Sequence, residues 1–476
     1  LKFTRQLNRM NSSWRRYLLY FAQEHVDFRF AEVQSLLSLF KITMRILEKP
    51  EDLQPYWIVE FQKEEDAKLL ASRSLSIRYC LELWGHAGGL DDLHRELKCI
   101  PTSFFENHLQ LSKTFKIAVQ SFCKHLAQTD KINIIQTFSY LPFKGTVNLN
   151  NPDTHLLYLE YYGIDSNDPP SEPYCVFFGR IVAAGFRQLI RELSLKTRKF
   201  IGNTSMDPQL SLLMANQAQV KLGDLVLDPF VGSGSLLVAA AYFGGYVVGS
   251  DIDYLMLHGK SRPSRIKQKK RDENESIKAN MEQYCLQDKY IDVMVNDFAT
   301  SFWRDDIRFD SIITDPPYGI REATEKVGIH KENYSISEKH LSTHIPAKVQ
   351  YEFSELYQDL LAFSAKHLRI GGRLVCWFPI FREDYSEEGL PTHQCVKLVS
   401  NSEQVLSKYT SRRLLTFEKI CEPQEENSNG ANTIADFRNK YYKARDESRR
   451  ERRLKEANIR EQNLLEALQR QTPLKD

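Results

Sequence analysis

The sequence has almost no excess charge of either sign, which separates it from chains that bind nucleic acids through an overall basic surface. Its 476 residues include 64 Lys and Arg against 62 Asp and Glu, a net charge of +2. Any basic surface must therefore be local. Hydrophobic residues make up 42% and charged residues 26%, which is typical of folded domains and excludes bulk disorder. A chain of this length has room for two or three domains.

Cysteine is sparse and shows no metal-binding pattern. The eight cysteines include no C-x-x-C pair and no paired Cys and His spacing, so the sequence predicts no metal site in this chain. Most stand in apolar or helical contexts, as Cys376 does, which is typical of reduced thiols packed as small hydrophobic groups. Reduced thiols indicate a reducing compartment, and we expect the protein in the cytoplasm.

Long apolar runs are also missing. The longest uncharged stretch, residues 229–250, has 22 residues, of which five are glycine and three are serine. A strand, a glycine loop, a helix and a second strand explain this composition better than a membrane span, so we expect no membrane association. No signal peptide is recognisable. Leu1 in place of Met, together with the later Met10, predicts that residues 1–9 are a leader or a non-native segment.

Short strands alternate with helices in the first 190 residues, which is typical of an α/β or α+β region. The expected strands are residues 17–21, 57–61, 115–119, 156–159 and 176–180, and the expected helices are residues 31–39, 64–70 and 185–195. No short motif in this half carries chemistry by itself.

The second half has the pattern of a doubly wound parallel sheet, with helical segments between successive strands. Asp207 and Pro208 predict a helix start, because proline is favoured in the first turn. Phe353, Leu356 and Leu360 recur at helical spacing. The expected strands are residues 225–227, 246–249, 291–295, 311–314 and 373–378, with a terminal hairpin from residues 395–399 and 412–417.

Two charged segments lie outside this pattern. Residues 261–271 contain six basic residues and no acid, and they interrupt the connection between the second and third strands. After a polar linker, residues 437–476 contain 12 Lys and Arg against seven Asp and Glu. Such runs are either solvated faces or surfaces that meet phosphates, and the sequence leaves both interpretations open.

The sharpest local signal is an apolar strand that runs into a glycine turn and then into an apolar helix, at Asp228, Gly232 and Gly234. This arrangement brings bare backbone and a helix N-terminus close to a ligand. A dinucleotide site would have a third glycine where Leu237 stands, and a Walker loop would have Gly-Lys-Ser/Thr. A pyrophosphate ligand is therefore disfavoured.

The same segment, with Pro229 and Phe230 after Asp228, resembles motif I of the S-adenosylmethionine methyltransferases, whose cofactor S-adenosyl-L-methionine is a nucleoside with a cationic sulfonium. An acid at a strand end suits such a ligand. Asp251 ends the next strand about 20 residues later and is expected to accept both ribose hydroxyls, with Asp253 as the alternative.

After the third strand, Asp297 is expected to meet the adenine amine and Phe298 its ring. The order and spacing of all these pieces, more than any one of them, predict a nucleoside cofactor.

The fourth strand ends in Asp315, Pro316, Pro317 and Tyr318. This resembles motif IV of the amino-group methyltransferases, which act on exocyclic amines or amides. The Asp315 carboxylate and the Pro316 carbonyl are expected to accept the two hydrogens of the target amine, which directs its lone pair toward the methyl group. Two prolines fix the backbone, and Tyr318 offers a flat face to the base. The alternative is a turn that merely ends the strand.

Taken together, the chain resembles the THUMP-domain RNA methyltransferases, and within them the tRNA guanosine-N2 methyltransferases that act at position ten. The resemblance covers about residues 198–417 and rests on residues 204–208, DPFVGSGSLL, GSDIDY and TDPPYGIRE. It implies a Rossmann-like methyltransferase domain that follows an α+β region, ferredoxin-like plus THUMP, which grips tRNA. It also implies a small zinc-binding activator subunit as partner.

The resulting domain scheme has five parts. These are a leader or non-native segment at 1–9, a ferredoxin-like domain at 10–85, a THUMP domain at 86–190, a methyltransferase domain at 191–421, and a charged linker and helical tail at 422–476. Two rivals stay open at this point. One is a DNA or RNA adenine-N6 methyltransferase, which shares the Asp-Pro-Pro-Tyr motif, and the other is an RNA-binding scaffold without activity.

Overall fold

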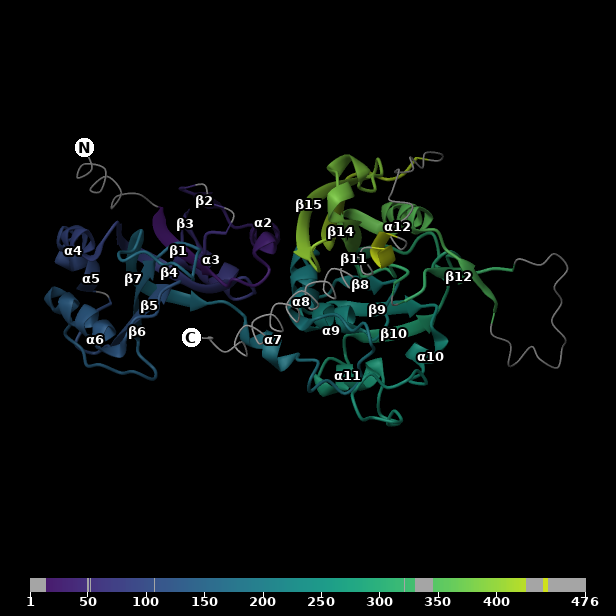
Figure 1. Cartoon of the computed structure of the whole chain (residues 1–476), viewed down its shortest axis with the longest axis horizontal. Coiled ribbons are helices and arrows are strands. Elements are labelled where there is room, and N and C mark those ends of the chain that lie inside the picture. Colours follow the sequence, from purple (N-terminus) through teal and green to yellow (C-terminus); the bar gives the residue numbers. More distant parts are fainter. Residues whose placement is uncertain are drawn as a thin grey trace, which may run out of the picture. The chain divides into compact units, whose positions relative to one another are not determined.

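The computed structural model describes residues 14–48, 51, 53–106, 108–320, 322–329, 346–424 and 440–443. The proposed leader and most of the charged tail lie outside these residues. Contacts divide the chain into two units (Figure 1). The N-terminal unit runs to Thr197 and includes Pro208–Gln219, and the C-terminal unit consists of Arg198–Asp207 together with the residues from Val220 onward.

The N-terminal unit is built on one seven-stranded sheet in the order β2-β3-β1-β4-β7-β6-β5. Its strands are β1 (Arg15–Phe21), β2 (Met44–Ile46), β3 (Tyr56–Phe61), β4 (Ile77–Ala87), β5 (Phe115–Phe122), β6 (Thr154–Tyr161) and β7 (Cys175–Ala184). Its helices are α2 (Arg29–Phe40), α3 (Glu64–Ala71), α4 (Leu90–Lys98), α5 (Thr102–Glu106), α6 (Gln128–Thr137), α7 (Gln188–Glu192) and α8 (Pro208–Gln217). The predicted strands and helices of this half are present, although one helix is shorter than expected. The structure adds β2, β4, α4, α5 and α6, which the sequence analysis did not predict.

The central addition is β4, which pairs with β1 on one side and β7 on the other. It carries Arg78, Glu82 and His86 among its apolar residues, and this mixture hid the strand pattern. The expected division between residues 85 and 86 falls inside β4, so a single sheet crosses it.

The helix expected at 185–195 is shorter because the chain stays beside β4 after β7 ends. The Gly185 N–H donates to the Arg78 carbonyl (3.0 Å) and the Phe186 N–H donates to the Ser74 carbonyl (2.9 Å). A Cβ atom at Gly185 would lie 1.8 Å from the Ile77 carbonyl oxygen. The close approach of these two segments delays the helix to Gln188.

Both faces of the sheet are buried at β1, as the alternation of its side chains shows. Leu19 packs into one core with residues of α2 and α3, whereas Leu18 and Tyr20 pack into a second core on the other face. Because neighbouring side chains of a strand point to opposite faces, the continuous apolar run of β1 is what a strand covered on both sides requires.

One buried carboxylate ties three segments of this unit together. Glu32 of α2 is fully buried, and its oxygens accept four hydrogen bonds. The donors are the Ser74 hydroxyl (2.9 Å), the N–H groups of Leu75 (2.7 Å) and Ser76 (2.9 Å), and the side-chain amide of Asn216 in α8 (2.8 Å). Each lone pair thus meets a donor, which compensates for the cost of removing the charge from water.

The C-terminal unit is the predicted doubly wound fold, teal to yellow in Figure 1. Its main sheet has the order β10-β9-β8-β11-β14-β16-β15, in which the first five strands are parallel and the last two antiparallel. The strands are β8 (Leu225–Asp228), β9 (Tyr246–Asp251), β10 (Tyr290–Val295), β11 (Phe309–Thr314), β14 (Leu368–Phe381), β15 (Val396–Val405) and β16 (Thr410–Lys419), with a separate pair, β12 (Glu325–Val327) and β13 (Lys348–Gln350).

The helices of this unit are α9 (Ser235–Tyr242), α10 (Tyr254–Leu257), α11 (Ile277–Gln283) and α12 (Phe353–His367). The five parallel strands, the terminal hairpin and α12 were all predicted from the sequence and are confirmed. Leu356 and Leu360 of α12 are fully buried against β11 and β14. Residues 229–250 form a turn, a helix and a strand, and among the described residues no helix is long and apolar enough to cross a membrane.

Part of the basic segment 261–271 serves the fold of this unit. The guanidinium of Arg271 donates to the Ile201 carbonyl (3.2 Å) and pairs with Glu275 (2.8 Å), and only 5% of its side chain is exposed. Arg265 donates to the Lys199 carbonyl (3.0 Å). These two arginines therefore stabilise the chain that leads into residues 203–207. The other basic residues of the segment, Arg262, Lys267, Lys269 and Lys270, are exposed.

We expect Glu32→Ala to lower the stability of the N-terminal unit by about 3 kcal/mol or more, because four buried donors lose their acceptor. Faster hydrogen exchange of β4 amides in the full chain measures the loss. Glu65→Ala, at an exposed position of α3, is the matched control and should change the stability by less than about 0.5 kcal/mol. Equal exchange in both variants would contradict this role of Glu32.

Candidate active site

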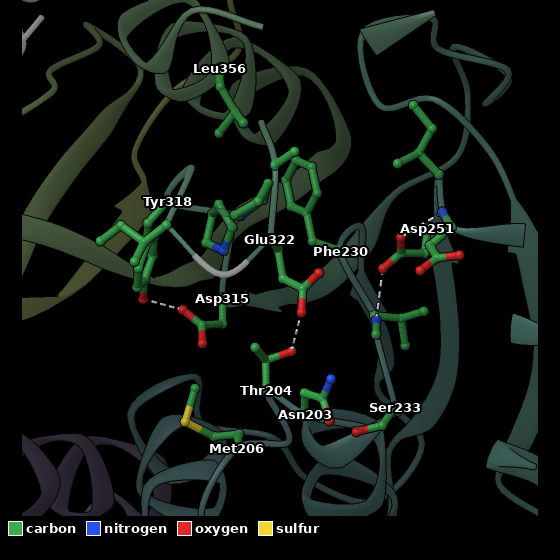
Figure 2. A pocket seen from close by; sticks show the side chains of 18 of the residues that line it. Asn203, Thr204, Met206, Phe230, Ser233, Asp251, Asp315, Tyr318, Glu322 and Leu356 are labelled. Atoms are coloured by element: carbon green, nitrogen blue, oxygen red, sulfur yellow. Dashed lines mark hydrogen bonds between the residues drawn. The ribbon is translucent and has the colours of Figure 1, made fainter. Parts of the chain in front are cut away.

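The carboxyl ends of β8, β9, β10 and β11 open into one cavity of about 980 Å³ in the C-terminal unit (Figure 2). Ligands of doubly wound folds bind at this edge, where the strand order reverses between β8 and β11. The predicted site residues that line it are Asp228, Pro229, Phe230, Gly232, Asp251, Asp297, Phe298, Asp315, Pro316, Pro317 and Tyr318. Gly234 alone among the predicted residues is absent from the lining.

Gly234 has a structural task behind the turn. It precedes α9 with a φ of 76°, and a Cβ atom there would lie 2.8 Å from the Ile277 side chain. Only glycine meets both conditions without strain. Its tight packing places the N-terminus of α9 next to the cavity, where Ser235 lines the wall.

Asp251 at the end of β9 holds the glycine turn. Its carboxylate accepts the N–H of Gly232 (2.8 Å) and the N–H of Asp253 (2.9 Å). Asp253, the alternative ribose ligand, instead uses its side chain to cap α10, where it accepts the N–H groups of Leu255 (2.9 Å) and Met256 (3.0 Å). Both acids line the cavity, and each of them accepts two backbone N–H groups.

Asp228 is the most deeply buried acid of the cavity, with 1% of the residue exposed. One oxygen accepts the Thr314 hydroxyl (2.8 Å) and the Phe230 N–H (3.1 Å). Burial is the main cause that raises the pKa of this carboxyl to about 8, and the nearby acids Asp251 and Asp315 add to the rise.

Asp297 and Phe298 lie at another wall of the cavity. The Phe298 ring packs on Phe230 with a centroid distance of 4.9 Å, which makes an aromatic surface beside the glycine turn. Asp297 accepts two N–H groups, from Ala299 (3.1 Å) and from Val327 of β12 (2.7 Å). Its carboxylate thus also anchors the segment that follows the fourth strand, a task that the sequence did not predict.

The Asp-Pro-Pro-Tyr segment follows β11 directly, and Figure 2 shows Tyr318 turned toward Asp315. The Tyr318 hydroxyl donates to one Asp315 oxygen, and the Arg412 guanidinium lies 3.4 Å from the other. Burial raises the pKa of Asp315 above its usual value, while Arg412 and the Tyr318 hydroxyl oppose this rise. A quarter of the Asp315 side chain stays exposed to the cavity.

Negative charge dominates the lining. Eight carboxylates face three cationic side chains, namely Asp207, Asp228, Asp251, Asp253, Asp297, Asp315, Glu322 and Glu325 against Lys348, Lys408 and Arg412. Such a surface repels phosphate and attracts a cation. A nucleoside that carries a cationic group fits the charge, the aromatic wall and the volume of this cavity. Among the described residues, no cluster of His, Cys, Asp or Glu is arranged to hold a metal ion.

Several lining residues escaped the sequence analysis. Residues 203–207, which overlap the helix start predicted at 204–208, form a wall of the cavity. The Thr204 hydroxyl donates to Glu322 (3.1 Å, Figure 2). The tip of the β15–β16 hairpin, residues 406–410, forms another part. Only the Asp-Pro pair before α8 signalled the first wall, and nothing in the sequence signalled the second.

The described part of the charged tail also reaches this site. The Tyr442 hydroxyl donates to the Ile320 carbonyl (3.1 Å), Lys440 pairs with Asp384 (2.6 Å), and Tyr441 lines the cavity. This part of the tail therefore packs beside the residues that follow Tyr318.

Comparisons with known proteins agree with this arrangement. The family model described as Tmrp11 THUMP N-terminal domain matches residues 15–187, and the one described as RMKL-like, methyltransferase domain matches residues 196–335. The chain thus has an N-terminal THUMP region and a C-terminal Rossmann-like methyltransferase domain.

Two curated relatives span nearly the whole chain. The tRNA (guanine(10)-N(2))-methyltransferase TRMT11 of Gallus gallus is 46% identical over 414 residues, 87% of this chain and 90% of the relative. The tRNA (guanine(10)-N(2))-methyltransferase of Saccharomyces cerevisiae is 35% identical over 417 residues, 85% of this chain and 93% of the relative. A solved structure, that of TrmN from Thermus thermophilus, is 15% identical, covers 85% of this chain and 100% of that chain, and has a TM-score of 0.41.

The raised pKa of Asp228 predicts a pH dependence of cofactor binding. At pH 7 the free carboxyl carries a proton, which must leave when a cationic ligand binds, so the affinity should increase as the pH rises toward the pKa of about 8. Calorimetry with S-adenosylmethionine, the cofactor expected from the sequence, should show about tenfold tighter binding at pH 8.5 than at pH 7.

Asp228→Asn provides the control, because it lacks this titration while it keeps an oxygen acceptor for Thr314. The ligand's own amine titrates equally with both proteins. The same pH slope in wild type and variant would contradict the assignment of the proton to Asp228.

Proposed function

Because the chain belongs to the family of the tRNA (guanine(10)-N(2))-methyltransferases, we propose that it transfers a methyl group from S-adenosylmethionine to the N2 amine of guanosine 10 in tRNA. The observation that carries this proposal is the convergence of Asp228, Asp251 and Asp315 on one cavity. The first two acids belong to the turn that suits the cofactor, and the third belongs to the motif that suits an amine.

The cofactor side of the cavity divides into three tasks. The Asp251 carboxylate accepts hydrogen bonds from the ribose hydroxyls. The hydrogen bonds that it also accepts from the Gly232 and Asp253 N–H groups keep the glycine turn in place. Phe298 and Asp297 receive the adenine. Asp228 and the other acids compensate the positive charge, and the bound cofactor supplies a methyl group on a cationic sulfur.

The acceptor side prepares a weak nucleophile. The lone pair of an exocyclic amine is delocalised into its ring, so the amine must be held in a geometry that frees it. The Asp315 carboxylate and the Pro316 carbonyl accept its two hydrogens, which pushes the lone pair out of the ring plane. Tyr318 holds the carboxylate through its hydroxyl, and its ring offers a face to the base. After transfer, solvent takes the proton from the positively charged amine.

We assign the binding of the substrate RNA to the N-terminal half. In this half, residues 10–85 serve as a ferredoxin-like domain and residues 86–190 as the THUMP domain. Phosphate contacts there set the affinity for tRNA. Residues 191–421 carry the catalysis.

A small zinc-binding activator subunit is proposed as partner on the resemblance alone. All eight cysteines are free thiols, which supports a location in the reducing cytoplasm.

We expect Asp251→Ala to weaken S-adenosylmethionine binding at least tenfold, because both ribose hydroxyls lose their acceptor and the Gly232 N–H loses its partner. Calorimetry measures the change. Asp253→Ala is the control, since it removes the cap of α10 and one of the eight acids of the lining but no expected ribose ligand, and its affinity should stay within about threefold of wild type. A larger loss in Asp253→Ala than in Asp251→Ala would exchange the two roles.

Asp315→Ala should lower kcat for tRNA methylation by about 10²–10³, because the amine loses an acceptor in the transition state. Asp315→Asn keeps one oxygen acceptor and should retain more activity than Asp315→Ala. Affinity for the cofactor and for tRNA should stay within about threefold of wild type in both variants.

Near-normal methyl transfer by Asp315→Ala would overturn the proposed mechanism. Loss of tRNA binding in the same variant would indicate a folding defect, which the matched Asp315→Asn protein separates from a catalytic one.

A further inference from the structure

Arg412 of β16 is held in a fixed plane at the end of the cavity that contains Asp315. It lies opposite Pro379 of β14, so Trp377, two residues earlier in β14, shares its face of the sheet. The guanidinium carbon lies 3.9 Å from the centroid of the Trp377 ring. Its Nε donates to Gln404 of β15 at 2.7 Å. Stacking and this hydrogen bond fix the orientation of the two terminal nitrogens.

The hydrogen bonds of the terminal nitrogens to other described residues are long. Nη1 lies 3.4 Å from an Asp315 oxygen and 3.5 Å from the Tyr318 hydroxyl oxygen, and Nη2 lies 3.5 Å from the Met206 sulfur. Ordinary N–H···O bonds are about 2.9 Å long, and a thioether is a weak acceptor. With 13% of its side chain exposed, Arg412 has little water to compensate, so an acceptor on a ligand would be strongly favoured.

Asp315 and Arg412 together present acceptors beside a donor. The Watson–Crick edge of guanine carries the complementary order, which is the N2 amine donor, the N1 donor and the O6 acceptor. Two carboxylate oxygens followed by a guanidinium thus resemble the edge that cytosine offers to guanine. The pair Asp315 and Arg412 therefore fits a guanine whose N2 amine has been delivered to Asp315.

We propose that Arg412 donates a hydrogen bond to O6 of the target guanine and thereby selects guanine over adenine. This inference rests on the proposed function, because it assumes that Asp315 receives the N2 amine. An adenine with its N6 amine at Asp315 places an acceptor, N1, against the carboxylate and a C–H group where guanine has O6. Arg412 then keeps only its long contacts to Asp315, Tyr318 and Met206, and a buried donor that faces a C–H group is a basis for rejecting the base.

The test combines a substrate change with a protein change. The substrate is tRNA that contains either guanosine or 6-thioguanosine at position ten; the thio base keeps the N2 amine and the N1 hydrogen but replaces O6 by a weaker acceptor. For wild-type enzyme, purified with its activator where activity requires one, we expect kcat/KM to be at least tenfold lower on the thio substrate. Arg412→Met should methylate both substrates slowly and with nearly equal kcat/KM.

Arg413→Met is the matched control, since the neighbouring arginine contacts Asn401, Glu403 and Tyr385 away from the cavity. It should keep the wild-type preference for guanosine. Cofactor affinity within about threefold of wild type shows that Arg412→Met is folded. A preference in Arg412→Met equal to that of wild type would overturn the proposal and leave Arg412 as a residue that only positions Asp315.

Arg412→Lys keeps the discrimination measurable if Arg412→Met is inactive, because lysine retains a single charged donor. We expect it to methylate with a reduced preference, and an unchanged preference would again overturn the proposal. Failure of the proposed function gives a different result: wild-type enzyme would then fail to methylate guanosine 10 at all, whichever residue stands at position 412.

Discussion

The site of the C-terminal unit depends on how the negative charges of the acids at one edge of its parallel sheet are compensated. Parallel strands place their carboxyl ends together, and here Asp228, Asp251 and Asp315 end or follow three neighbouring strands. Each acid is compensated in a different way: Asp251 by two backbone N–H groups, Asp315 by Tyr318 and Arg412, and Asp228 only in part, by Thr314 and Phe230. The deficit at Asp228 is what a cationic ligand can remove.

The hairpin β15–β16, which lies beyond β14 at the antiparallel end of the same sheet, completes the site. It supplies Arg412, which forms an ion pair with Asp315. The tip of the hairpin forms part of the cavity wall. Under the proposed function, the acids at the ends of the parallel strands bind the methyl donor, and the proposed role of Arg412, on an antiparallel strand, is to recognise the methyl acceptor. This division explains how a cofactor site common to many chemistries acquires a preference for one base.

The sequence predicted the parts of the molecule that depend on local pattern. The five parallel strands, α12 and the glycine turn followed from periodicity and from residues with special backbone geometry, and the acids followed from their positions at strand ends. It missed β4, because charged residues interrupt its apolar pattern. It also missed Arg412 as a site residue, because Arg412 lies 97 residues after Asp315 along the chain. The pairing of β16 with β14 brings the two side chains together. Long-range pairing of this kind leaves no local signal.

The most direct test of this account is transfer of a tritiated methyl group from S-adenosylmethionine to unmodified tRNA transcripts, with and without a co-expressed zinc-binding partner, followed by nucleoside analysis. The account predicts N2-methylguanosine as the labelled product, and no label in a transcript that has adenosine in place of guanosine 10. N6-methyladenosine as the sole labelled product would contradict it.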